Sequence, residues 1–158
     1  MATRICKVKR ASGKLEIEYE VPSKDGANEF VLKSRELPRG EMIRAFEALV
    51  QPAIVDVLEL PDAYTEDCKA TGASFSYVPG PTGKEIMGCV ITLQKKLSTA
   101  NSPLILNTPH LPSEAYSGNP NDTNPTLPGE LVDRLEKLQE EARLYIRGER
   151  AQATLPGV

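Results

Sequence analysis

Apolar and acidic residues alternate over residues 15–21, and this pattern constrains the fold more than any other feature of the sequence. The apolar positions are Leu15, Ile17, Tyr19 and Val21, and the acidic positions between them are Glu16, Glu18 and Glu20. Because successive side chains of a strand point to opposite faces of its sheet, the segment predicts a strand with one buried face. The turn sequence Ala11-Ser12-Gly13 before it extends the prediction to a β-hairpin over residues 4–21.

Later segments also have the composition and spacing of strands. A polar turn over residues 22–28 is expected to lead into a short third strand at residues 30–32. Residues 70–97 predict a second hairpin, with a turn at residues 78–83 that is rich in proline and glycine. Residues 104–106 predict one more short strand at an edge of the sheet, because prolines flank the segment and proline cannot donate a ladder hydrogen bond.

Two segments place apolar residues at helical spacing, which predicts amphipathic helices. The first begins at Pro38-Arg39-Gly40-Glu41 and has the apolar stripe Met42, Ile43, Phe46, Leu49 and Val50. Pro52 is expected to break or kink this helix, because proline has no N–H and its ring clashes with the preceding turn. The second helix has the stripe Leu131, Leu135, Leu138, Ala142 and Tyr145, with Gly148 as its expected C-cap.

The order of these elements predicts an α+β fold, an antiparallel sheet of about five to six strands with two amphipathic helices packed on one face. The length of 158 residues fits one domain. We place this domain at residues 1–150 and expect a short flexible tail over residues 151–158.

Composition and charge argue against several classes of protein. The net charge is −3 and the pI is near 5.3, which is unlike a broadly basic nucleic-acid-binding protein. No segment has the ~20 apolar residues of a membrane span, and no secretory signal is evident, so a cytoplasmic protein is expected. Cys6, Cys68 and Cys89 form no CxxC pair, which predicts reduced thiols rather than a zinc site. Neither a metal nor a cofactor is expected.

A long segment rich in proline and asparagine, Ser102–Gly129, precedes the last helix. Long loops in compact domains are usually functional or disordered. This one contains His110, the single histidine of the chain. Closely spaced prolines indicate that Asn107–Pro112 is stiff, whereas Ser113–Asn124 is expected to be mobile. Asn107 and His110 are therefore candidate binding residues.

No set of residues has catalytic spacing, so a non-enzymatic function is expected. His110 has no second histidine with which to share a metal, and no nucleophile with a recognisable local signature accompanies it. The sequence Gly80-Pro81-Thr82-Gly83-Lys84-Glu85 is similar to a phosphate loop, but its spacing is two residues short and Glu85 replaces the required serine or threonine. A hairpin turn is the better interpretation.

Basic residues form the strongest candidate for a ligand site. The first hairpin and the last long strand contribute Arg4, Lys7, Lys9, Arg10, Lys14, Lys95 and Lys96. If these strands are neighbours, the residues form a basic patch that holds phosphates, with tyrosine or phenylalanine nearby to stack on bases. The alternative is a charged edge that prevents sheet-to-sheet aggregation.

Short strings at four places add a resemblance. They are Gly72–Tyr77, Met87-Gly88, Leu106–Pro112 and Tyr145–Gln152. Together they resemble a small uncharacterised family of bacteriophage proteins from early or recombination regions, over the chain from about residue 50 onward. The resemblance implies a phage protein of the infected bacterial cell, and the family supplies no established catalytic residues.

The sequence Gln152-Ala-Thr-Leu155-Pro156 is similar to the tail peptide with which bacterial DNA-metabolism proteins dock on the sliding clamp. Gln152 and Leu155 match that peptide, whereas Pro156 stands where it has a phenylalanine. The match implies docking through Gln152 and Leu155, and the alternative is a frayed tail after the last helix.

Two functions remain open from the sequence. The first is a non-enzymatic phage accessory protein of DNA replication or recombination that contacts single-stranded DNA or the host replisome. The second is a counter-defence protein, often a homo-oligomer, that binds a host immune protein or sequesters a nucleotide messenger. A hydrolase or nuclease is disfavoured because no motif of clustered Asp, Glu or His is present, and a virion component because nothing indicates extended assembly surfaces.

Overall fold

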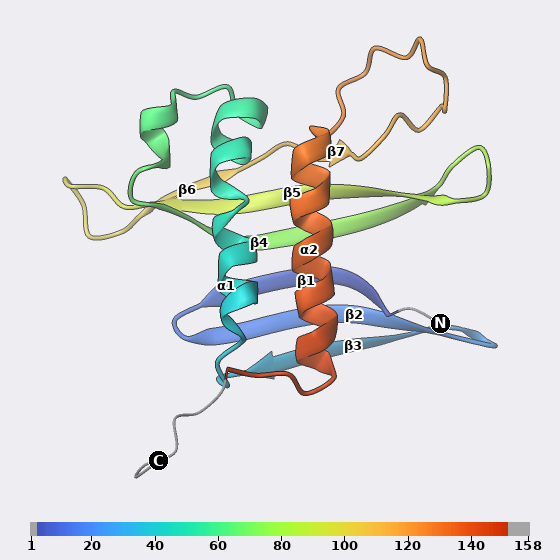
Figure 1. Cartoon of the computed structure of the whole chain (residues 1–158), viewed down its shortest axis with the longest axis horizontal. Coiled ribbons are helices and arrows are strands. Elements are labelled where there is room, and N and C mark those ends of the chain that lie inside the picture. The colour runs from blue at the N-terminus through green and yellow to red at the C-terminus, as the bar shows by residue number, and fades with distance from the viewer. Residues whose placement is uncertain (1–2, 152–158) are drawn as a thin grey trace.

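A computed structural model of the chain describes residues 3–151 and shows a sheet with helices on one side (Figure 1). The strands are β1 (Arg4–Ala11), β2 (Lys14–Ser23), β3 (Gly26–Ser34), β4 (Cys68–Pro79), β5 (Glu85–Lys95), β6 (Leu104–Asn107) and β7 (Leu111–Pro112). The α-helices are α1 (Gly40–Glu47) and α2 (Gly129–Ile146), and between α1 and β4 lie a π-helical turn, η1 (Pro52–Val57), and a 3₁₀ turn, η2 (Asp62–Thr65).

All strand pairings are antiparallel, and the strand order is β3-β2-β1-β4-β5-β6, with β7 also paired to β5. The predicted α+β class is confirmed, and β7 is an additional strand that the sequence did not predict. The sheet consists of two antiparallel units, β1–β2–β3 and β4–β5–β6. They meet at a short seam where Lys7–Lys9 of β1 pairs with Gly72–Ser74 of β4.

The first hairpin closes with a two-residue turn, Ser12-Gly13, in which both residues have positive φ (52° and 75°). Turns of this kind match the right-handed twist of the strands that they join. The next turn is also short, because β2 continues to Ser23 and β3 already begins at Gly26. The prediction of a long polar turn over residues 22–28 was therefore wrong.

Pro22 is compatible with its place in β2 for a simple reason. The residues that flank a two-residue hairpin turn form a hydrogen-bonded pair, and the next pair along the strands does not exchange backbone hydrogen bonds. Pro22 and Ala27 form that second pair, so β3 needs no N–H from Pro22. β1 does not pair with β2 there, because its described pairing with β2 begins at Arg4 opposite Glu20.

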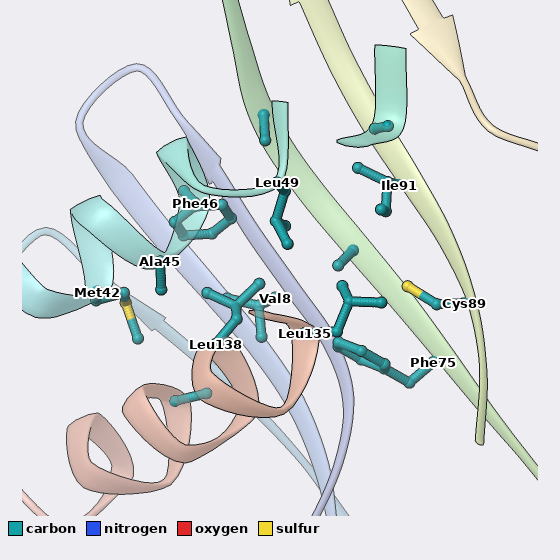
Figure 2. Close-up of a cluster of buried hydrophobic side chains, with 14 of the residues drawn as sticks. Val8, Met42, Ala45, Phe46, Leu49, Phe75, Cys89, Ile91, Leu135 and Leu138 are labelled. Carbon is teal, nitrogen blue, oxygen red and sulfur yellow. The ribbon is translucent and has the colours of Figure 1, made fainter. Parts of the chain in front are cut away.

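The core lies between the sheet and the two helices (Figure 2). All five stripe residues of α2 predicted from the sequence are at most 1% exposed. They pack in one cluster with Phe46 of α1 and with the helix-facing residues of the central strands, among them Val8 and Ile91. Burying a side chain of this size stabilises a fold by about 1.5–3 kcal/mol, so these contacts hold the helices on the sheet.

Both predicted helix ends are confirmed. The first helix is interrupted before Pro52, and the chain then makes a wider turn in which Leu58 donates its backbone N–H to the carbonyl of Ala53. At the end of α2, Gly148 has a φ of 108°, and its N–H bonds to the carbonyl of Tyr145. A glycine reaches this left-handed region without a steric penalty, which explains the stop.

Candidate binding surface

The sheet face opposite the helices carries the candidate site, and we call it the open face. Val8, Ala73 and Ile91 point into the core, so their neighbours along the strands point the other way. Helices cover only one side of the sheet in Figure 1. On β1, β4 and β5 the open-face residues are mainly small or basic: Lys7, Lys9, Gly72, Ser74, Ser76, Gly88, Val90 and Thr92.

His110 lies on the open face, in the short connection between β6 and β7. Its Nε2 is 2.7 Å from the hydroxyl oxygen of Ser76 on β4. To reach Ser76 the ring passes over Gly88 of β5, where a Cβ atom would come within 2.5 Å of Nε2. The position of His110 therefore depends on the absence of a side chain at Gly88.

The backbone around His110 is held firmly against β5. Thr108 is buried, and its backbone N–H bonds to the carbonyl of Ile91 at 2.9 Å. Its hydroxyl oxygen accepts the N–H of Ile91, also at 2.9 Å. One residue earlier, the amide oxygen of Asn107 accepts the hydroxyl of Thr92 at 2.7 Å. These contacts place Asn107 and His110 on the same face as Ser76.

A serine hydroxyl within hydrogen-bond distance of an imidazole is the geometry of a nucleophile and its base. Such a pair also needs a group that orients the histidine and donors for the developing oxyanion. Within residues 3–151 no hydrogen bond fixes Nδ1 of His110, and no group of three or more His, Cys, Asp or Glu could hold a metal. The arrangement is suited to presenting a donor and an acceptor to a ligand.

The predicted basic residues do not gather into a single patch. The two units of the sheet meet at β1 and β4, so β5 with Lys95 is not adjacent to β1. The basic residues of the first hairpin and the lysines at the end of β5 therefore do not form one common patch. Lys95 instead donates to the carbonyl of Glu66 and lies over the ring of Tyr64, 5.7 Å from its centre.

Two arginines of the first hairpin have partners within the protein. Arg4 bonds to Glu20 at 2.9 Å and also to Glu85, and these contacts raise the pKa of the guanidinium. Arg10 lies on the helix side of the sheet, with its guanidinium 4.6 Å from the centre of the Phe46 ring. Burial lowers its pKa, and its Nε donates to the carbonyl of Ala70 at 3.0 Å. Both arginines have structural contacts.

Lysines make up the basic side of the open face. Lys7 and Lys9 lie there, and Lys7 is 3.8 Å from Glu18 in a weak, partly exposed ion pair. Lys9 is exposed. Lys14 is exposed in the strand that follows the first turn, and Lys96 is exposed just beyond β5. Of the predicted binding residues, Lys7, Lys9, Asn107 and His110 share the open face around β4 and β5. Lys14 lies on the same face at the start of β2, because Leu15 beside it points into the core.

Sequence reasoning missed Ser76, Gly88, Thr92 and Thr108. The small residues of β4 alternate with larger ones from Gly72 to Tyr77, and this alternation was the available signal for an uncovered face. No local pattern indicated that His110 would meet Ser76, because the two residues are 34 positions apart.

A separate hollow of about 770 Å³ lies at the other end of the sheet. The start of β4, the end of β5 and the loop that leads to β6 form its walls. Two exposed lysines, Lys69 and Lys96, line it together with polar groups such as Gln94, Asn101 and Ser102. Its volume lies in the range of sites for small molecules and cofactors.

Burial raises the pKa of all three cysteine thiols, and that of Cys89 rises to about 12. A thiol with a raised pKa is a poor nucleophile, since the thiolate is the reactive form. Cys6, Cys68 and Cys89 are free thiols in the structure. None of the helices within residues 3–151 is long and apolar enough to cross a membrane.

The candidate docking residues Gln152 and Leu155 lie outside the described residues. No family model, curated protein or solved structure matches the chain. The open face and the hollow are therefore the observations on which a functional proposal rests.

Proposed function

We propose that the chain is a non-enzymatic accessory protein of bacteriophage DNA replication or recombination, and that it contacts single-stranded DNA through the open face. One observation carries the proposal: an uncovered sheet surface with small polar residues at its centre, lysines on one side and His110 with Asn107 on the other. Small side chains let an extended strand lie close to the sheet. Lys7 and Lys9 would neutralise its phosphates.

The surrounding charges define the path of the strand. Glu16, Glu18 and Glu20 of β2 lie on the same face beyond β1, and they repel phosphate. We therefore expect the nucleic acid to follow β4 and β5 and not to cross β2. Such a local site is compatible with the net charge of −3.

The test is a fluorescence anisotropy titration with a labelled oligothymidylate of about 15 nucleotides, a length that covers a typical single-domain site, at low and high salt. We expect salt-sensitive binding that the K7E/K9E variant weakens by tenfold or more, with a salt slope smaller by about 1.4, because two phosphate contacts are lost. The matched control is K24E/R35E, which changes the charge equally at two exposed residues just beyond the ends of β3, away from β4 and β5. Absence of salt-sensitive binding by the unmodified protein would remove the DNA proposal and leave a replisome protein as the partner.

The hollow with Lys69 and Lys96 favours a second candidate, a counter-defence protein that sequesters a nucleotide messenger. Its size suits a nucleotide, and its two lysines, which outnumber the one acidic residue of the lining, Asp67, suit phosphates. Isothermal titration calorimetry with cyclic dinucleotides distinguishes the two candidates. Binding that K69A/K96A abolishes and K7E/K9E leaves intact would support the second function, whereas absence of heat with every nucleotide would count against it.

A further inference from the structure

The outer edge of β3 is long, regular and unpaired among residues 3–151. β3 follows β2 from Gly26 to Ser34 without a register shift, and it contains no proline. Edge strands of natural proteins are usually short, bulged, interrupted by proline or covered, because free backbone groups recruit other strands. This edge also exposes large apolar side chains, since Val31 is 56% and Phe30 44% exposed.

The hairpin geometry determines which backbone groups of β3 are free. Ser23 and Gly26 flank a two-residue turn and form a hydrogen-bonded pair, after which bonded and non-bonded pairs alternate. The even-numbered residues of β3 therefore bond to β2. Ala27, Glu29, Val31 and Lys33 direct their N–H and C=O groups outward, where a further strand would bond to them.

We propose that a second copy of this chain pairs with this edge, antiparallel and with Val31 on the two-fold axis. In this register Glu29 of each copy faces Lys33 of the other, so the interface gains two pairs of opposite charge. Val31 faces Val31, and Phe30 of each copy faces Leu32 of the other in a close, non-hydrogen-bonded pair. Pairs of these kinds are the ones that stabilise antiparallel strands.

The charged side chains of β3 favour this register over the registers with the axis at the next residue on either side. A residue with outward backbone groups must face another such residue, so the two-fold axis must pass through a residue of β3 and not between two residues. An axis at Phe30 would place Glu29 opposite Val31, and an axis at Leu32 would place Lys33 opposite Val31. The axis at Val31 gives both charges of β3 an opposite partner. The other edge strand, β6, is only four residues long.

The proposed pairing does not depend on the DNA proposal, but it has a consequence for the same surface. A two-fold axis between antiparallel neighbours is perpendicular to their sheet, so both copies present the same face to the same side. The helices of the two copies would lie together on one side. The open faces would form one continuous surface on the other.

The test is sedimentation equilibrium of the full chain and of three variants, E29K, K33E and E29K/K33E. We expect the unmodified protein to dimerise and each single variant to weaken the dimer by tenfold or more, since each places like charges opposite one another twice. The double variant exchanges the two charges and should return the dissociation constant to within about threefold of the original. A monomer at every concentration, or a double variant as weak as the single ones, would overturn the proposal.

Amide hydrogen exchange of the unmodified protein supplies a second readout that needs no variant. The amides of Glu29, Val31 and Lys33 should become protected as the protein concentration rises, while those of Phe30 and Leu32 stay protected throughout. Exchange of the three outward amides that is fast and independent of concentration would also overturn the proposal.

Discussion

His110 occupies the space above Gly88 that a side chain would fill. In a G88A variant the new Cβ would lie 2.5 Å from Nε2 of His110 and 2.8 Å from the Ser76 hydroxyl. The ring is exposed and can turn away, so we expect the contact with Ser76 to be lost and the free energy of unfolding to fall by only about 1 kcal/mol. Because the chain has one histidine, a single imidazole cross-peak in a carbon–proton NMR spectrum reports the change.

G129A is the matched control, because nothing lies within 4 Å of a Cβ at Gly129. The imidazole signal should stay unchanged in this variant. If G88A also leaves it unchanged, His110 does not lie over β5 as described.

Cys89 and Tyr77 make stability depend on alkaline pH. Burial raises the pKa of Cys89 from its ordinary 9.0 to about 12, and burial also raises the pKa of Tyr77 well above its ordinary value. Above pH 9 the unfolded chain loses the thiol proton while the folded protein keeps it, so folding stability declines as the pH rises toward 12. Each group contributes at most about 1.4 kcal/mol per pH unit to this decline.

Denaturant unfolding measured from pH 7 to pH 11 tests this expectation. The C89A variant should lose less stability above pH 9 than the unmodified protein, although its stability at pH 7 is lower. Parallel curves for the two proteins would show that Cys89 does not keep its proton in the folded state.

Among the elements, α2 is connected to the start of α1 by a buried carboxylate. The side chain of Glu141 is 1% exposed and lies 3.5 Å from Nε of Arg39 and 3.4 Å from Nζ of Lys137. Replacing it with alanine in E141A should lower the free energy of unfolding by about 1–3 kcal/mol, because Lys137 loses this partner and Arg39 keeps only Glu41. The control is E140A, an exposed position whose change should cost less than about 0.5 kcal/mol. Equal effects of the two variants in urea unfolding would contradict this role.

The elements themselves could largely be predicted from the sequence, because their signals are local. Alternation in residues 15–21, the stripe of α2 and the break at Pro52 each depend on residues within a few turns. β7 could not be predicted, since its two residues form a strand only by pairing with Gly88 and Cys89. The buried charge of Glu141 was also missed, because a charged residue in a helix reads as solvent-exposed until the neighbouring element is known.

At the scale of the whole molecule, the long connection between β7 and α2 is closed at its base. Ser113 donates its backbone N–H to Met87, and Leu127 donates to Pro112, so the two ends of the loop meet beside β7. We expect replacement of residues 115–125 by a short glycine–serine linker to change the free energy of unfolding by less than about 1 kcal/mol. Chemical denaturation measures this. A loss of several kcal/mol would show that the loop contributes to the core.

The candidate site was only partly accessible from the sequence. Asn107 and His110 were identified from the stiff proline-flanked segment, and the structure places both on one face. The basic residues were correctly assigned to strands except Lys96, which lies just beyond β5. The strand order separates the two groups, and strand order depends on pairings between residues far apart in the chain. The contact between Ser76 and His110 could not be predicted for the same reason, because the two residues lie 34 positions apart in the chain.

The short seam between β1 and β4 gives the molecule an uneven resistance to force. Backbone pairing across it is confined to Lys7–Lys9 and Gly72–Ser74, whereas the strands within each unit pair along most of their length. A load that pulls the outer strands apart would break the sheet along this line first. α1 and α2 cross the boundary between the two units (Figure 1). The side chains that the helices bury, and not the backbone hydrogen bonds of the sheet, therefore set the mechanical strength of the protein.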